Sequence, residues 1–423
     1  MLTLKLLREQ PQFVIDRLAV KNFDAKDIVN NIIEADAKRR SAQTQLDSIL
    51  AEQNLLAKQI GSLMKEGKKA EADEVKKKVA DLKQSSKDLE QLMEEQNNQM
   101  NSALVLLPNL PCADVPAGKS AEDNVVVREG GDIPNLPQNA QPHWELAKSL
   151  DIIDFDLGVK ITGAGFPVYK GKGARIQRAL IAFFLDRNTS AGYLEVQPPL
   201  VVNEASAYGT GQLPDKGEQM YHVGLDNFYM IPTAEVPVTN IYRDAILSKE
   251  DFPVKLTAYT QCFRREAGSY GKDVRGLNRL HQFDKVEIVQ LSLPENSYQA
   301  LDNMVKHVEA IVQSLELPYR ILRLCGGDIS FTSALTYDFE VYSAAQKRWL
   351  EVSSVSNFES FQANRLKLRY KDADGKMQLA HTLNGSSLAL PRILAALIEN
   401  NQDDKGRIRI PKALQEYTGF ERI

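Results

Sequence analysis

The sequence predicts an α+β protein in two parts: an N-terminal antiparallel two-helix coiled-coil arm, and a larger domain with an antiparallel sheet flanked by helices. Apolar residues recur at heptad spacing between Ile28 and Met100, as in a coiled coil. Residues 108–142 are rich in proline, glycine and asparagine, which is typical of a connector. From His143 onward, strand-like and helix-like segments alternate without a regular βαβ rhythm, and this favours an antiparallel sheet. We therefore divide the chain into residues 1–107, 108–142 and 143–423.

The composition is that of a globular protein larger than one domain. The chain has 423 residues, 43% of them hydrophobic and 26% charged, so it is too long for a single core and too apolar for disorder. It has no run of eighteen apolar residues, and charges interrupt its start too soon for a secretory signal, so we expect a cytosolic protein with no membrane contact. The net charge of −4 excludes a globally basic nucleic-acid binder but allows a local basic patch. Cys112, Cys262 and Cys325 form no CxxC pair, so we expect neither a disulfide framework nor a zinc site.

The first 107 residues are dominated by the predicted arm, over about 27–104. Before it, residues 1–22 predict a short strand or turn and then an amphipathic helix that begins near Pro11. The first seam of the arm consists of Ile28, Ala35, Ala42, Ile49, Leu56 and Leu63, with Ile32, Leu46 and Ile60 beside them. After a turn at Gly67, the second seam consists of Val75, Val79, Leu82, Ser86, Leu89, Met93, Gln96 and Met100. At about 1.5 Å per residue the first helix would be roughly 50 Å long.

The tip of the arm is locally basic. Residues 58–87 contain nine lysines and five acidic residues, a net charge of +4. Seven of the lysines are candidate contacts to the phosphate backbone of a structured RNA: Lys58, Lys65, Lys68, Lys69, Lys76, Lys77 and Lys78. Charge alone does not separate this hypothesis from the alternative that the lysines keep a coiled coil in solution.

The larger domain follows a connector that contains one predicted strand, at 125–127. A helix with an apolar stripe is predicted over 172–190. The strand predicted after it, over 196–202, contains Pro198 and Pro199 and therefore suits the edge of a sheet.

An arginine-rich hairpin over residues 263–289 carries the clearest chemical signal. Strand-like runs flank a glycine-rich loop, and the arginines in or beside that loop are Arg264, Arg265, Arg275 and Arg279. Guanidinium groups bind phosphate oxygens bidentately, and Phe283 offers a ring for base stacking. The hairpin therefore predicts binding of a nucleoside triphosphate.

A second polar segment lies at residues 230–240. If these residues form a strand, Thr233 and Glu235 face the same side, where a hydroxyl and a carboxylate can hold an ammonium group. A polar edge strand is the alternative explanation for such a pair.

Two later segments also contain candidate site residues. Glu351 and Ser354 provide oxygen ligands of the kind that Mg²⁺ takes. Residues 381–402 predict a strand, a sharp turn and an amphipathic helix, with Ser386 or Ser387 as its N-cap and Pro391 in its first turn. The electropositive start of that helix then carries Arg392.

Three segments of the hairpin resemble motif 2 of class II aminoacyl-tRNA synthetases, in the form found in seryl-tRNA synthetases: FRREAG, GKDVRGL and RLHQFDKVE. The helix and strand from 172 to 202 resemble motif 1, which forms the homodimer interface in that class. Residues 381–402 resemble motif 3, and the triplet TAE at 233–235 resembles the serine-binding segment. The resemblance spans nearly the whole chain, arm included.

The resemblance implies ATP-dependent attachment of L-serine to tRNA(Ser) through a seryl-adenylate, with Mg²⁺ and without a catalytic zinc; whether tRNA(Sec) is also a substrate stays open. It implies three catalytic residues, Arg264, Glu266 and Arg392. It implies serine binding by Thr233, Ala234, Glu235, Glu287, Asn384 and Ser386. It implies ATP binding by Arg264, Arg265, Glu266, Arg279, Leu280, Phe283, Glu351, Val352, Ser353, Ser354 and Arg392, with the metal on Glu351 and Ser354. The arm would grip the long variable arm of the tRNA.

The sequence departs from the family at a few positions, and two other interpretations stay open. Family members often have cysteine where this chain has Val355, arginine where it has Asn364 and glycine where it has Ser387. One alternative is a paralogue that loads a small amino acid onto a carrier protein, although such proteins lack the long arm. The other is a coiled-coil interaction protein with a degenerate synthetase body, which predicts losses among the motif residues that this chain retains.

Overall fold

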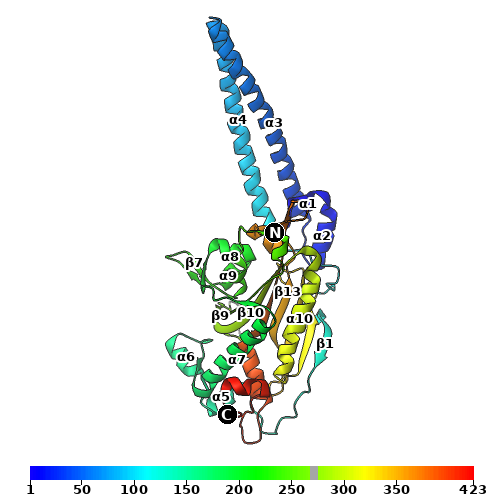
Figure 1. Ribbon diagram of the computed structural model, residues 1–423, viewed down its shortest axis with the longest axis vertical. Helices are drawn as coiled ribbons and strands as arrows, with labels where there is room; N and C mark the ends of the chain where they lie inside the picture. The colour runs from blue at the N-terminus through cyan, green and yellow to red at the C-terminus, as the bar shows by residue number, and fades with distance from the viewer. Residues whose placement is uncertain (267–274) are drawn as a thin grey trace. The chain divides into compact units, whose positions relative to one another are not determined.

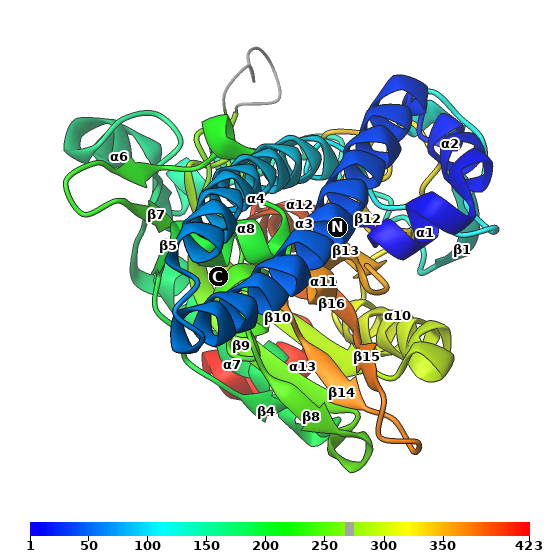
Figure 2. The ribbon, with the colours of Figure 1, turned by 90° about the horizontal axis from the view of Figure 1, so that it is seen from above.

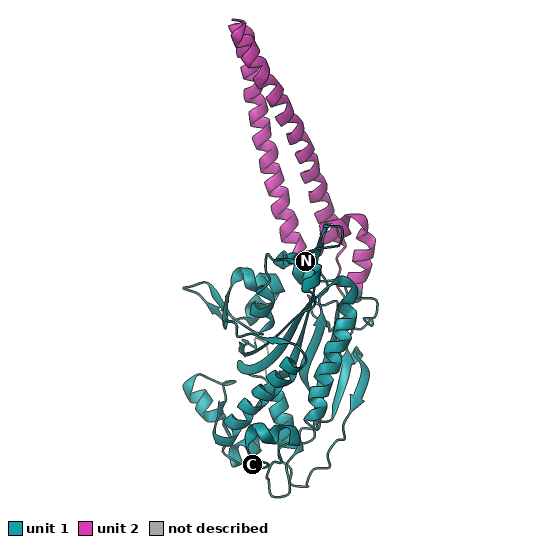
Figure 3. Ribbon diagram, viewed as in Figure 1, with its two compact units in different colours: residues 1, 20–22, 109–423 teal, residues 2–19, 23–108 magenta. Residues whose placement is uncertain are grey.

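The computed structural model describes residues 1–266 and 275–423, and the chain forms two compact units within it (Figure 3). The helical unit comprises residues 2–19 and 23–108, and the sheet unit comprises residues 1, 20–22 and 109–423. The centre of the glycine-rich loop lies outside the described residues. Within the two described ranges, no helix is both long enough and apolar enough to cross a membrane.

The helical unit contains α1 (Leu4–Glu9), α2 (Pro11–Val20), α3 (Lys26–Lys65) and α4 (Lys69–Leu104). The prediction of a strand or turn at its start is wrong, because α1 occupies that place. The Thr3 hydroxyl caps α1 by accepting a hydrogen bond from the backbone N–H of Leu6 at 3.3 Å. Pro11 begins α2, where its missing N–H costs nothing.

The antiparallel arm is formed by α3 and α4 as predicted. The buried positions of the first seam are Ile32, Ala35, Ala42, Leu46 and Leu63. The turn contains Gly67 at φ +75°, a conformation that favours glycine. One polar pair lies in the seam, where Gln53 Nε2 donates to Ser86 Oγ at 2.8 Å.

A buried carboxylate ties the base of the arm together. The side chain of Asp36 is 1% exposed, and Arg8, Arg39 and Arg40 approach it at 3.5, 2.9 and 3.1 Å. Burial alone would raise the pKa of Asp36, but the hydrogen bond and charge of Arg39 and the charges of Arg40 and Arg8 lower it below its ordinary value.

We expect Asp36→Asn to weaken the helical unit by roughly 2–3 kcal/mol at neutral pH, because three arginines lose their shared anionic partner. The folded-state pKa of Asp36 lies below its unfolded value, so this stabilisation is present above about pH 4 and is lost as the pH falls through the folded pKa. Hydrogen exchange of residues 26–46 therefore separates the variant from the parent at neutral pH, and the difference shrinks at about pH 3.

The matched control is Glu34→Gln. Glu34 pairs with Lys38 but is 65% exposed, so its loss leaves exchange nearly unchanged. Equal protection of the parent and Asp36→Asn at neutral pH would contradict the role given to Asp36.

The sheet unit is built on one eight-stranded sheet in the order β1-β11-β12-β13-β16-β10-β9-β4. Its strands are β1 (Val125–Gly130), β4 (Leu194–Glu195), β9 (Val254–Phe263), β10 (Gln282–Ser292), β11 (Tyr319–Arg323), β12 (Leu335–Ser343), β13 (Arg348–Asn357) and β16 (His381–Ala389). Neighbouring strands are antiparallel except β4 and β9, which run parallel. The predicted antiparallel sheet is therefore confirmed, with one parallel pair at its edge.

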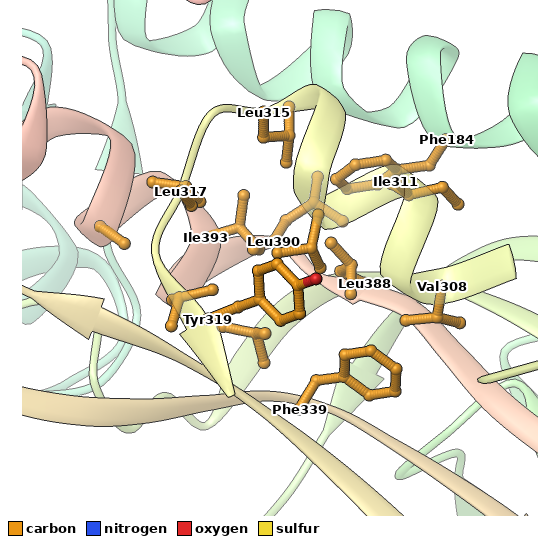
Figure 4. Packing of buried hydrophobic residues seen from close by; sticks show 14 of the residues in the cluster. Phe184, Val308, Ile311, Leu315, Leu317, Tyr319, Phe339, Leu388, Leu390 and Ile393 are labelled. Carbon is orange, nitrogen blue, oxygen red and sulfur yellow. The ribbon is translucent and has the colours of Figure 1, made fainter. Parts of the chain in front are cut away.

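Helices pack their apolar sides on one face of this sheet. They are chiefly α7 (Gly171–Ser190), α10 (Ser297–Ser314) and α12 (Leu390–Asn400) (Figure 1). In the core, Phe339 of β12 and Leu388 of β16 lie beside Val308 and Ile311 of α10 (Figure 4).

Shorter elements surround the sheet. The remaining helices are α5 (His143–Ser149), α6 (Phe155–Ile161), α8 (Glu204–Thr210), α9 (Glu235–Asn240), α11 (Phe361–Leu366) and α13 (Lys412–Thr418). Three small sheets comprise β2 (Ile153–Asp154) with β3 (Val168–Tyr169); β5 (Val201–Asn203), β7 (Phe228–Met230) and β6 (His222–Val223); and β15 (Met377–Leu379), β14 (Arg369–Lys371) and β8 (Ile246–Ser248). Figure 2 shows β8, β14 and β15 side by side.

Several local predictions differ from the structure. The strand predicted at 196–202 is split into β4 and β5, because Pro198 and Pro199 interrupt pairing between them. Ser386 and Ser387 lie inside β16 and do not cap α12; its N-cap is Ala389. Pro391 does lie in the first turn of α12.

The predicted strand around Thr233 and Glu235 is also wrong. The strand there, β7, ends at Met230, and Glu235 begins α9. Pro237 is tolerated in this helix because it falls in the first turn, where the proline ring has no preceding turn to clash with.

Candidate active site

A cavity of about 500 Å³ lies on the sheet face opposite the apolar core. Lys285 and Glu287 of β10 line it, whereas Val286 and Ile288 of the same strand belong to the core. The predicted site residues that line this cavity are Thr233, Glu235, Arg264, Glu266, Arg279, Leu280, Phe283, Glu287, Glu351, Val352, Ser353, Ser354, Asn384, Ser386 and Arg392. Segments more than 150 residues apart in the sequence therefore converge on one space.

One end of the cavity holds a buried ion pair. The side chains of Lys285 and Glu287 are 6% and 2% exposed, and Lys285 Nζ donates to Glu287 Oε1 at 2.8 Å. Thr233 Oγ1 joins them: it accepts from Lys285 Nζ at 2.9 Å and donates to Glu287 Oε2 at 2.5 Å. The three side chains form a small polar wall whose charges are balanced.

Glu235 lies beside this wall with its carboxyl group buried. Its backbone N–H donates to Glu287 Oε2 at 3.0 Å, and Gln362 Nε2 donates to Glu235 Oε1 at 2.6 Å. Burial and, next, the negative charge of Glu287 raise the pKa of Glu235 to about 7. The carboxyl group therefore gains or loses a proton easily near neutral pH, and a nearby cation would favour its ionised form.

The hairpin between β9 and β10 contributes the second wall. The guanidinium of Arg264 lies 5.2 Å from the ring centroid of Phe283, and its Nε donates to the carbonyl of Pro232 at 3.3 Å. Arg279 Nη1 donates to Glu266 Oε2 at 2.9 Å. A flat ring and two guanidinium groups are thus presented to the same space, an arrangement that suits an aromatic base and phosphate oxygens.

The start of α12 supplies a third wall. Arg392 Nε donates to the carbonyl of Asn278 at 3.0 Å, and Arg392 Nη1 donates to the carbonyl of Glu351 at 2.7 Å. The Glu351 carboxylate lies 3.7 Å from the same Nη1. A cation held at a helix N-terminus makes this wall attractive to anions.

Oxygen ligands for a metal ion occur along β13. Glu351 and Ser354 both line the cavity, and the Glu351 side chain is 53% exposed. Behind them, Asp338 is hydrogen-bonded to Ser354, and burial, followed by the charge of Glu351, raises the pKa of Asp338. In the part of the chain that the structure describes, no group of three or more His, Cys, Asp or Glu residues forms a metal cage. Two oxygen ligands fit Mg²⁺, which fills its other positions with water and phosphate oxygens.

Two predicted site residues do not line the cavity. Ala234 is fully buried, in an apolar cluster under the start of α9. The side chain of Arg265 turns away and donates to the carbonyl of Glu218 at 3.3 Å.

Sequence reasoning also missed residues that do line it. Lys285 could have been found, because it lies two residues from both Phe283 and Glu287 on one strand and therefore faces the same side. Lys216 and Asn278 lie in irregular segments, where no periodic pattern gives a signal. Burial, followed by the positive charge of Arg264, lowers the pKa of Lys216, so its charged ammonium form is less favourable there than in water.

The seven arm lysines lie in the helical unit, and all are exposed. Three of them form ion pairs with acidic neighbours: Lys68 with Glu66, Lys76 with Asp73 and Lys78 with Glu52. Exposed pairs of this kind are weak and exchange readily for other anions.

Family models match two parts of the chain. The model for the class II tRNA synthetase core domain (G, H, P, S and T) matches residues 221–401, and the seryl-tRNA synthetase N-terminal domain matches residues 1–111.

Full-length relatives agree with these matches. The chain is 50% identical to the serine–tRNA ligase of Salinibacter ruber and 46% identical to that of Akkermansia muciniphila, in each case over 100% of this chain and 99% of the relative. Among solved structures, it is similar to seryl-tRNA synthetase from Pyrococcus horikoshii complexed with ATP. That similarity has a TM-score of 0.95 and 33% identity, and covers 100% of this chain and 99% of the other.

We expect Glu235→Gln to raise the melting temperature of the ligand-free protein at about pH 8 and to change it little at about pH 5. In the unfolded chain this carboxyl group ionises near 4.5, but in the folded chain only near 7. Between these values, rising pH increasingly favours the unfolded state of the parent, a penalty that glutamine removes while it keeps an acceptor for Gln362.

Melting curves of both proteins across this pH range test the expectation. Glu250→Gln, at an exposed position, is the control and should follow the parent. A Glu235→Gln variant with the parent's pH profile would show that Glu235 ionises normally in the folded protein.

Proposed function

The chain belongs to the seryl-tRNA synthetase family, whose members attach serine to tRNA, and from this premise we propose that the cavity activates L-serine with ATP and transfers it to tRNA(Ser). The observation that carries the proposal is the convergence of Arg264, Arg392 and Glu351 on one cavity, next to the polar wall of Thr233 and Glu287. We propose that the reaction takes place in the cytosol.

In the first step a carboxylate oxygen of serine attacks the α-phosphorus of ATP. A carboxylate–phosphorus bond forms, the bond to the bridging oxygen of the β-phosphate breaks, and pyrophosphate leaves with the bond electrons. The step requires little proton chemistry, so the protein acts by positioning the reactants and neutralising charge. In our proposal Arg264 contacts the serine carboxylate and the α-phosphate, while Arg279 and Arg392 bind the terminal phosphate of a bent triphosphate.

Phe283 and Glu266 would position the adenine. The 5.2 Å approach of Arg264 to the Phe283 ring leaves an aromatic surface beside the guanidinium, suited to a stacked base. We propose that Glu351 and Ser354 hold Mg²⁺, which would withdraw charge from the phosphates; Val352 and Ser353 of the same strand line the site beside them.

The serine pocket in our proposal comprises Thr233, Glu235 and Glu287, with Asn384 and Ser386 on the neighbouring strand. The positive ammonium of serine would favour the ionised form of Glu235, which is poised near neutrality. Alanine lacks a hydroxyl group to donate to these buried acceptors and would leave one unpaired, a loss that discriminates strongly.

We further propose a homodimer formed through α7 and β4. The β4 strand ends the eight-stranded sheet, and Leu194 on it is 65% exposed. An apolar side chain on an open sheet edge favours burial against a second copy.

The helical unit is proposed to bind tRNA(Ser), with the seven tip lysines facing the phosphate backbone. Their exposure and the net positive charge of residues 58–87 support a contact that does not depend on base sequence.

We expect Arg264→Ala to reduce serine-dependent ATP–pyrophosphate exchange by at least about 10²–10³-fold, because one donor to the developing charge is lost. Arg265→Ala is the matched control: it removes the adjacent guanidinium, which lies outside the cavity. Near-normal exchange in Arg264→Ala, or an equal loss in Arg265→Ala, would refute the role of Arg264.

Pyrophosphate exchange with a panel of amino acids tests the function itself. A carrier-loading enzyme would prefer another amino acid, and a non-catalytic interaction protein would activate none.

We expect removal of residues 54–85, closed by a short glycine turn, to leave serine-dependent pyrophosphate exchange intact and to abolish charging of tRNA(Ser). The cut removes all seven candidate lysines and keeps the Gln53–Ser86 hydrogen bond as the new end of the arm. Both activities are measured on the same preparation. If the shortened protein charges tRNA normally, the arm does not bind it as proposed.

A further inference from the structure

A buried polar cluster lies outside the cavity and has no part in the chemistry described so far. It consists of His143 at the start of α5, Ser343 at the end of β12, Gln346 in the turn before β13, and Glu399 near the end of α12. The side chains of His143 and Glu399 are both 0% exposed. None of the four residues lines the cavity.

Glu399 is the centre of the cluster. Its Oε1 accepts hydrogen bonds from the backbone N–H of His143 at 2.9 Å, from His143 Nδ1 at 2.6 Å and from Gln346 Nε2 at 2.9 Å. The Ser343 hydroxyl donates to the other carboxylate oxygen. Burial alone would raise the pKa of Glu399, but the hydrogen bonds from His143 and Ser343 lower it below its ordinary value. The group is therefore a carboxylate whose donors hold it in one orientation.

The far side of the His143 ring contacts the hairpin loop. The backbone N–H of Leu277 donates to His143 Nε2 at 2.8 Å, so Nε2 accepts and Nδ1 carries the proton that Glu399 receives. The loop reaches the ring because residue 276 is glycine: a Cβ there would lie 2.1 Å from Nε2, and the residue has φ +63°. Glu399 thus fixes the ring, and the ring fixes the loop.

A parallel branch leads to Arg392. Gln346, which donates to Glu399, also accepts from Asn278 Nδ2 at 3.0 Å. The carbonyl of Asn278 in turn accepts from Arg392 Nε at 3.0 Å. Leu277, Asn278 and Arg392 all line the cavity, at the wall assigned above to the terminal phosphate.

We propose that His143 is a positioning residue for ATP: by accepting from the Leu277 N–H it holds the loop after residue 276 so that Asn278 orients Arg392 toward the triphosphate. This inference rests on the proposed function. It goes beyond that function because His143 does not line the cavity. Within the described residues, the serine wall of Thr233, Lys285 and Glu287 shares no hydrogen bond or ion pair with the cluster, so we expect the effect to be confined to ATP.

The experiment compares two substitutions at one position. Asparagine places an amide nitrogen near the position of Nδ1, so His143→Asn keeps a donor to Glu399 and loses the acceptor for Leu277. Glutamine is longer by one methylene, so His143→Gln can present its Oε1 to Leu277. In serine-dependent pyrophosphate exchange we expect His143→Asn to raise KM for ATP about tenfold, the effect of one lost hydrogen bond, and to leave KM for serine within about twofold. His143→Gln should recover most of the loss.

Ser343→Ala is the control for stability. It removes a donor to Glu399 and the acceptor of the Gln346 backbone N–H, but it keeps the bond between His143 and Leu277. It should therefore lower the melting temperature and raise KM for ATP much less than His143→Asn does. If Ser343→Ala raises KM for ATP as much as His143→Asn does, or if His143→Asn raises both KM values equally, the cluster only stabilises the fold and the inference is overturned.

A further variant reaches the same contact from the loop side. Gly276→Ala removes no side chain of the cluster, but its Cβ would lie 2.1 Å from His143 Nε2, so the loop must move away from the ring. The variant should therefore also raise KM for ATP selectively, and it replaces His143→Asn if that protein does not fold. If the parent is active and these variants have the parent's KM for ATP, the inference is overturned but the proposed function is not. A parent with no serine-dependent exchange overturns the proposed function, and the inference falls with it.

Discussion

The ion pair between Lys285 and Glu287 is the interaction on which the cavity depends. Both charges lie in the middle of a sheet whose other face is an apolar core, where an unpaired charge would be strongly destabilising. Their pairing, completed by Thr233, allows a polar face to exist on a strand that is buried on both sides. Burial, followed by the negative charge of Glu287 in this pair, raises the pKa of Glu235.

Alternation along the central strands organises the rest of the site. Strand β10 directs Val286 and Ile288 to the helices and Lys285 and Glu287 to the cavity, so one stretch of backbone supports both the core and the chemistry. The other two walls come from the hairpin between β9 and β10 and from the start of α12, where the direction of the chain changes.

The sequence was sufficient to predict helices whose buried residues recur at a regular spacing. The seams of the arm and the helix α7 were predictable because burial repeats every three or four residues over many turns. It was insufficient around Thr233, where Val236, Val238 and Thr239 favour a strand by propensity. There α9 forms because Ala234 and Val238 pack against β9 and β10, a tertiary contact that no local pattern contains. Most of the proposed site residues were identified through motif resemblance, whereas Lys216 and Asn278 depend on how irregular segments fold back.

The polar pair in the arm seam restricts how the length of the arm can change. Because Gln53 and Ser86 meet across the two helices, they align one helix with the other at a single offset. An insertion of one residue in α3 alone would rotate everything beyond it by about 100° and turn apolar positions into water. Lengthening that preserves the seam requires whole heptads added to both helices together, so the reach of the arm is quantised in increments of roughly 10 Å.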